Sequence, residues 1–125
     1  MKDNHEEQRF GFERLRVWQA VLEALEQAMA VAAGMDRPFG ELKDQLRRAA
    51  LSIVCNFCEG VGKDGPDQRR FFRIARGSTY EAAGLVIAAH KLALASEAQY
   101  RAARAPLIAV AAMLTRLLDL PRQAA

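Results

Sequence analysis

The sequence predicts an all-α fold, an antiparallel up-down-up-down four-helix bundle. Three observations predict it: apolar residues recur at alternating spacings of three and four along four segments, aromatic residues make up only 7% of the chain, and short polar or glycine-rich stretches separate the segments. A chain of 125 residues has room for one core and not for two. We therefore expect a single domain spanning residues 1–125, with tails at residues 1–9 and 119–125.

The first helix is expected over residues 12–33, ending near Gly34. Its expected core stripe is Leu15, Trp18, Leu22, Leu25, Met29 and Ala32. A second apolar stripe lies about 100° round the same helix and consists of Val17, Val21, Ala24, Ala28 and Val31. Two apolar stripes favour self-association, since a single chain would leave one of them in water, although a wide face can also be buried at a bundle corner.

The second and third helices are expected over residues 39–59 and 66–95, joined by a turn that contains Gly60, Gly62, Gly65 and Pro66. The expected core residues of the second helix are Leu42, Leu46, Ala49 and Ile53. Those of the third helix are Phe71, Ala75, Ser78, Ala82, Leu85, Ala89 and Leu92, with Val86, Ile87 and Ala93 outside this seam. Gly77 and Gly84 are interpreted as tolerated or close-packing positions.

The fourth helix is expected over residues 97–118, with Ser96 as its N-cap. Its expected core residues are Tyr100, Ala103, Leu107, Val110, Leu114 and Leu117. Pro106 removes one backbone hydrogen bond from this helix and is expected to kink it.

Positive charge gathers in the middle and last thirds of a chain whose net charge is +3. We identify Lys63, Arg69, Arg70 and Arg73 as the candidate nucleic-acid-binding residues, because clustered cations attract phosphate. The alternative is that these side chains form solvated helix faces and ion pairs.

Polar residues interrupt the expected seams, and buried polar groups need partners. If the second and third helices pair around a turn near Lys63, Arg47 or Arg48 lies opposite Glu81, and Glu59 lies opposite Arg69 or Arg70. We expect an ion pair at each of these two places. The expected structural polar network comprises Arg47, Arg48, Ser52, Asn56, Glu59, Arg76, Ser78 and Glu81.

No residue pattern in the sequence supports catalysis, a metal or a cofactor. Neither His5 nor His90 has a Glu three positions earlier, and Ser52, Ser78 and Thr79 have no adjacent His. Cys55 and Cys58 form a C-x-x-C late in a helical pattern, where they are expected to be small buried core residues rather than a redox pair or half a zinc site. The chain has no membrane-spanning run and begins with a polar segment, so we expect a cytoplasmic protein.

Two ordered motifs carry a family resemblance. QLRRAALSIVCNFCEG, residues 45–60, and RFFRIARGSTYEAAGL, residues 70–85, resemble the second and third helices of 23S ribosomal RNA intervening-sequence proteins, which are related to the accessory variability proteins of diversity-generating retroelements. The similarity extends from Phe12 to Leu118, with Val54 where the family usually has Pro. It implies a homopentamer without known enzymatic activity.

These observations lead to two hypotheses of function. The first is a non-catalytic oligomer that binds RNA or a ribonucleoprotein partner through its basic surface, where a ring would multiply weak phosphate contacts. The second is a protein-interaction scaffold, with a partner such as a reverse transcriptase and no nucleic-acid role.

Overall fold

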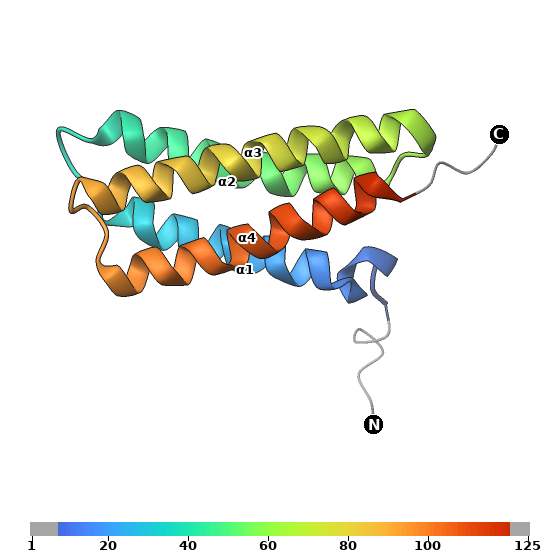
Figure 1. Cartoon of the computed structure of the whole chain (residues 1–125), viewed down its shortest axis with the longest axis horizontal. Helices are drawn as coiled ribbons and strands as arrows, with labels where there is room; N and C mark the ends of the chain where they lie inside the picture. The colour runs from blue at the N-terminus through green and yellow to red at the C-terminus, as the bar shows by residue number, and fades with distance from the viewer. Residues whose placement is uncertain (1–7, 121–125) are drawn as a thin grey trace, which may run out of the picture.

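The computed structural model describes residues 8–120 and consists of four long helices lying side by side (Figure 1). They are α1 (Arg16–Ala33), α2 (Gly40–Val61), α3 (Gly65–Lys91) and α4 (Glu97–Asp119), and a short 3-10 helix (Gly11–Arg14) precedes α1. No strand occurs within this described part. Most of the expected tails, residues 1–7 and 121–125, fall outside it.

Two helix ends differ from the sequence prediction by four residues, and α2 extends to Val61, so Gly60 belongs to the helix rather than to the turn. α1 begins at Arg16 rather than near residue 12, because Leu15 is extended (φ −78°, ψ 140°) and separates α1 from the 3-10 helix. α3 ends at Lys91 rather than at 95, because Ala93 has a positive φ of 61° and the Leu94 N–H donates back to the Ala89 carbonyl at 2.8 Å. The chain therefore reverses sooner than its apolar periodicity indicates.

The predicted cap of α4 is confirmed. The Gln99 N–H donates to Ser96 Oγ at 3.1 Å, and the Ser96 N–H donates to Gln99 Oε1 at 3.0 Å. This reciprocal pair satisfies two backbone donors that the start of a helix would otherwise leave free.

Each helix packs against two neighbours: α1 against α2, α2 against α3, α3 against α4, and α4 against α1. The contacts between α2 and α3 fix their register, since Ser52 meets Ser78 and Gly60 lies against Phe72. The α2–α3 turn lies at the same end of the molecule as the start of α1 and the end of α4 (Figure 1). Within residues 8–120, no helix is long and apolar enough to cross a membrane.

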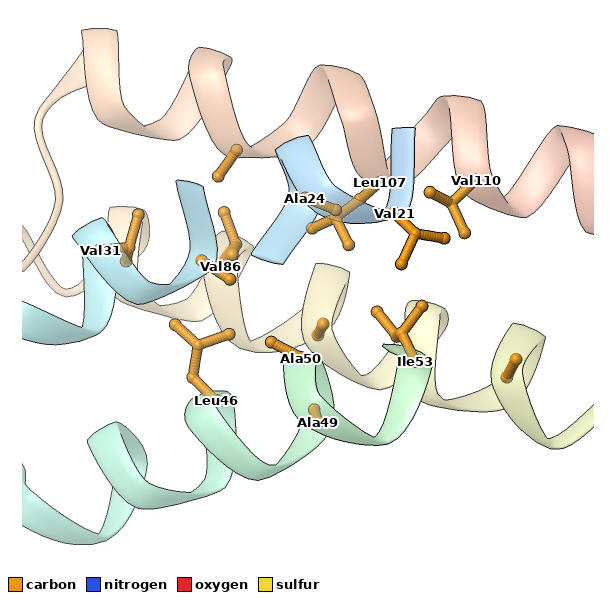
Figure 2. Close-up of a cluster of buried hydrophobic side chains, with 14 of the residues drawn as sticks. Val21, Ala24, Val31, Leu46, Ala49, Ala50, Ile53, Val86, Leu107 and Val110 are labelled. Atoms are coloured by element: carbon orange, nitrogen blue, oxygen red, sulfur yellow. The ribbon is translucent and has the colours of Figure 1, made fainter. Parts of the chain in front are cut away.

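The core is a central seam of mostly small and branched side chains that all four helices contribute (Figure 2). Ala49 and Ile53 of α2, Val86 of α3, and Leu107 and Val110 of α4 are all buried. Such side chains let the helix axes approach closely.

In α1 the prediction of which stripe faces the core is wrong. Val17, Val21, Ala24, Ala28 and Val31, expected on the outside, are buried. Of the expected core stripe only Ala32 is buried; Trp18, Leu22, Leu25 and Met29 are partly buried, and Leu15 is 46% exposed. Trp18 of the bulkier stripe faces α2, where its ring stacks on Phe57 with centroids 6.0 Å apart.

The other seams are confirmed in part. In α3 the alanines expected in the core, Ala75, Ala82 and Ala89, are buried. The other buried residues of this helix are Phe72, Thr79 and Val86, each of which follows directly after an expected core residue, Phe71, Ser78 or Leu85. Leu92 is exposed. Most of the expected core residues of α2 and α4 are buried, and only Leu42, Tyr100 and Leu117 are partly buried. The buried ones are Leu46, Ala49, Ile53, Ala103, Leu107, Val110 and Leu114.

Candidate nucleic-acid interface

The turn between α2 and α3 positions the first candidate cation, Lys63. Gln68 Nε2 donates to the carbonyls of Gly60 at 3.1 Å and Lys63 at 3.0 Å, which ties the start of α3 to the end of α2. Gly65 takes a left-handed φ of 54° that suits a residue without a side chain. Lys63 itself is exposed on this ordered turn.

Three of the four candidate cations are open to solvent. Lys63, Arg70 and Arg73 are exposed, and the last two lie on the second and third turns of α3. The Arg70 guanidinium lies 5.2 Å from the centroid of the Phe71 ring, an arrangement that orients the cation and leaves its N–H groups free to bind. We call Lys63, Arg70 and Arg73 the basic patch.

Arg69, the fourth candidate, does not belong to this patch. Its Nη2 donates to the Leu118 carbonyl at the C-terminal end of α4, and its Nε is buried. A cation at the end of a helix satisfies a free carbonyl and complements the helix dipole. Arg69 therefore fastens α4 to α3 and is not available to a phosphate.

Part of the expected polar network forms at the edge between α2 and α3. The hydroxyls of Ser52 and Ser78 share a hydrogen bond of 2.7 Å. Asn56 Nδ2 donates to the Ser52 carbonyl at 2.9 Å and to Ser52 Oγ at 3.0 Å. Because Ser52 Oγ accepts a hydrogen bond from Asn56, the hydroxyl proton of Ser52 is free to donate to Ser78 Oγ. These three residues connect the helices and hold their register.

The prediction of two ion pairs beside this network is wrong. Among residues 8–120, neither Arg47 nor Arg48 pairs with Glu81, and Glu59 pairs with neither Arg69 nor Arg70. The expected levels along the helices were close to those observed, but Arg69 bonds to the Leu118 carbonyl of α4, and the other charged residues are exposed. The serines one turn away face each other instead.

Arg76, the last member of the expected network, bonds to a different helix. Its Nη1 donates to Thr115 Oγ1 of α4 at 3.3 Å. Thr79, which was not among the expected core residues, is the buried polar residue of α3, and its hydroxyl donates to the Ala75 carbonyl at 2.7 Å.

Sequence reasoning missed a polar cluster at the α3–α4 turn. His90 Nε2 lies 2.8 Å from Glu97 Oε2, and Arg101 Nε donates to Glu97 Oε1 at 2.9 Å. The hydrogen bond from Arg101, followed by that from His90, lowers the pKa of the Glu97 carboxyl below its usual value. The His90 ring also stacks on Tyr100 with centroids 4.1 Å apart. The spacing of Glu97 and Arg101, four residues apart on one helix, was the available signal.

The cysteine pair differs from expectation in burial. Cys55 is exposed and Cys58 partly buried, and both are free thiols. Burial, then the neighbouring Cys55 and Glu59, raise the pKa of the Cys58 thiol. A raised pKa lowers the fraction of reactive thiolate. No group of three or more histidine, cysteine or acidic side chains within residues 8–120 could hold a metal ion.

The chain matches the model of a known protein family. Residues 13–116 match the family model described as 23S rRNA-intervening sequence protein. A search of curated proteins found no match.

Proposed function

Because the chain belongs to the family of 23S rRNA-intervening sequence proteins, we propose that it is a non-catalytic homopentamer of antiparallel up-down-up-down bundles that binds RNA, or a ribonucleoprotein partner, through its basic patch. The proposal places this assembly in the cytoplasm, where free thiols such as Cys55 and Cys58 stay reduced.

The exposure of the basic patch carries the proposal. Lys63, Arg70 and Arg73 extend into solvent from one end of the bundle, and within residues 8–120 none of them forms an ion pair with a carboxylate. Cations that are not neutralised inside the protein can replace the counterions of a phosphate backbone. Repeating the patch around a ring would add avidity without any new type of contact.

Exposed apolar side chains support the assembly. Leu51, Tyr80 and Ile87 are 49%, 62% and 49% exposed on helix faces that the single chain does not cover. Faces of this kind in a small soluble protein commonly mark association surfaces. The stripe that first suggested association, Val17 to Val31, does not contribute, because it is the core of α1.

The test is binding to a structured, fluorescently labelled RNA at several salt concentrations. Lys63→Ala/Arg70→Ala removes two cations of the patch, and Arg37→Ala/Arg104→Ala removes two exposed cations elsewhere as a matched control. We expect the log–log salt slope of the patch variant to fall by about 0.7 to 0.9 for each phosphate that the protein no longer neutralises, with a smaller change in the control. Equal changes in both variants, or no binding by wild type at low salt, would refute RNA binding by this patch.

A protein-interaction scaffold is the second candidate function, and one observation favours it. Proteins that read single-stranded RNA stack bases on exposed aromatic rings. Among residues 8–120 only Phe10 and Tyr80 have strongly exposed rings, and both lie outside the basic patch. If wild type binds no RNA at low salt, a protein partner becomes the better explanation of the exposed surfaces.

A further inference from the structure

An exposed stripe on α3 has the spacing of a helix-packing seam. Its residues recur at alternating steps of four and three, and all of them are exposed. The α3 stripe is Arg73, Gly77, Tyr80, Gly84, Ile87 and Lys91. Its centre alternates glycines with large apolar side chains, and a cation lies at each end.

Packing within a single chain does not require the two glycines. A Cβ built at Gly77 or Gly84 would meet no atom within 4 Å, so neither glycine permits close packing inside the bundle. Each weakens α3 by about 1 kcal/mol relative to alanine. A glycine on an open helix face lets another backbone approach closely, and here the glycines form hollows on either side of Tyr80.

α2 presents a complementary exposed stripe. The α2 stripe is Glu41, Asp44, Arg48, Leu51, Cys55 and Glu59. Its centre contains Arg48 and Leu51, of which Leu51 is 49% exposed, and its two ends are acidic. Glu41 and Glu59 are separated by as many residues as Arg73 and Lys91, about 27 Å along a helix. The acidic ends of one stripe thus match the basic ends of the other in spacing.

We propose that the α3 stripe of one chain docks against the α2 stripe of a neighbouring copy, so that the chains join head to tail into a closed ring. This inference rests on the proposed homopentamer and specifies its interface. In such a heterologous contact each chain contributes two different surfaces, and rotation closes the ring.

Symmetry gives an independent check on the pairing. Rotation about an axis parallel to the helices changes neither the direction of a helix nor its height, so the neighbour's α2 runs past α3 at the same level as the chain's own α2. That level is known, because Gly60 lies beside Phe72 and Ser52 beside Ser78.

In this register the two stripes match. Arg73 lies level with Glu59, and Lys91 lies level with Glu41, so opposite charges meet at both ends. In the ring Arg73 is therefore an interface residue, and Lys63 and Arg70 remain as the cations of the basic patch that are open to RNA. Tyr80 lies level with Leu51, which brings two large exposed apolar groups together. The remaining level pairs are Gly77 with Cys55, Gly84 with Arg48, and Ile87 with Asp44 or Gln45.

The positions of the two helices also fit ring closure. α2 and α3 are adjacent members of the four-helix cycle, so their outer faces diverge by about 90°. A ring of five requires neighbours at about 108° as seen from each chain. Two opposite faces of a bundle, about 180° apart, would instead extend the assembly into an open filament.

Directed disulfide cross-linking tests the pairing. Gly77→Cys places a thiol level with the natural Cys55 of the neighbour, and a Cys58→Ser background removes the other thiol. With copper phenanthroline and oxygen as oxidant, we expect a ladder of covalent multimers up to the ring size on a non-reducing gel. The same chain carrying Cys55→Ser should give at most a cross-linked pair.

The outcomes separate this inference from the proposed function. If light scattering finds the wild-type oligomer but oxidation gives no ladder, the proposed assembly stands and this interface is wrong. A wild-type chain that stays monomeric at every concentration would overturn both.

A second pair of variants tests the proposed interface without introducing cysteines. Gly84→Gln adds a side chain to the α3 stripe at a position where a Cβ meets no atom of its own chain within 4 Å, and Ala112→Gln makes a similar change at an exposed position of α4. We expect the first to weaken association on the order of 100-fold with its helical circular dichroism retained, and the second to leave association unchanged. Equal association of both variants would contradict the proposed interface.

Discussion

Gly60 near the end of α2 is the position where the packing makes its sharpest prediction. A Cβ at Gly60 would lie 2.6 Å from both Cδ1 and Cε1 of Phe72 and 3.3 Å from the Gln68 carbonyl oxygen. Phe72 is buried, and its ring stacks on Phe57 with centroids 5.8 Å apart, so it has little room to move. We predict that Gly60→Ala destabilises the protein although alanine is the better helix former.

The size of the effect follows from two opposing contributions. Overpacking of a buried ring costs about 1 to 3 kcal/mol. Replacing glycine by alanine inside a helix returns at most about 1 kcal/mol, and less at the penultimate residue of α2. The expected net loss is about 1 to 2 kcal/mol, which lowers the urea midpoint by about 0.5 to 1 M for a protein of this size.

The assay is urea unfolding at a fixed protein concentration, because association contributes to stability. Gly40→Ala is the matched control: it lies at the first residue of the same helix, where a Cβ meets nothing within 4 Å, and it should leave stability unchanged or slightly raised. Adding Phe72→Leu to Gly60→Ala should recover part of the loss, measured against Phe72→Leu alone. A Gly60→Ala midpoint equal to or above that of Gly40→Ala would refute the packing argument.

Three further predictions follow from the polar contacts. In a double-mutant cycle, Ser52→Ala and Ser78→Ala should show a coupling of about 1 kcal/mol from their shared hydrogen bond; additive unfolding energies would contradict that contact. Arg69→Ala should lower the unfolding free energy by about 1 to 2 kcal/mol and Arg70→Ala by less than about 0.5 kcal/mol, since only Arg69 holds the end of α4; equal effects would argue against that role. Glu97 has a lowered pKa in the folded protein, so its contribution is present at neutral pH and disappears as the pH falls below the usual range of glutamate. The difference in thermal midpoint between wild type and Glu97→Gln should therefore shrink on acidification, and a constant difference would contradict the lowered pKa.

Helix number and most helix boundaries could be predicted from the sequence, because the spacing of apolar residues and the cap at Ser96 are local signals. The choice of core stripe in α1 could not. Both stripes of that helix are apolar, and the smaller Val17 and Ala24 lie inside because the neighbouring helices approach closely, whereas Trp18 reaches across to Phe57. Such a choice depends on the distance between helices, which no single segment encodes.

The candidate site shows the same division between local and tertiary information. Basic residues could be found by counting charge, but the sequence does not distinguish Arg69 from Arg70. Their adjacent positions lie about 100° apart on α3, which turns Arg69 toward the end of α4 and Arg70 toward solvent. The expected ion pairs failed for a similar reason: the level along the helices was close, whereas the direction of each side chain depends on the packing angle.

Native mass spectrometry of the wild-type protein with a structured RNA tests the central claim most directly. We predict a complex of five chains with RNA bound, and loss of the RNA alone when Lys63 and Arg70 are both replaced by alanine. A mass of one chain without RNA at every protein concentration would contradict the account.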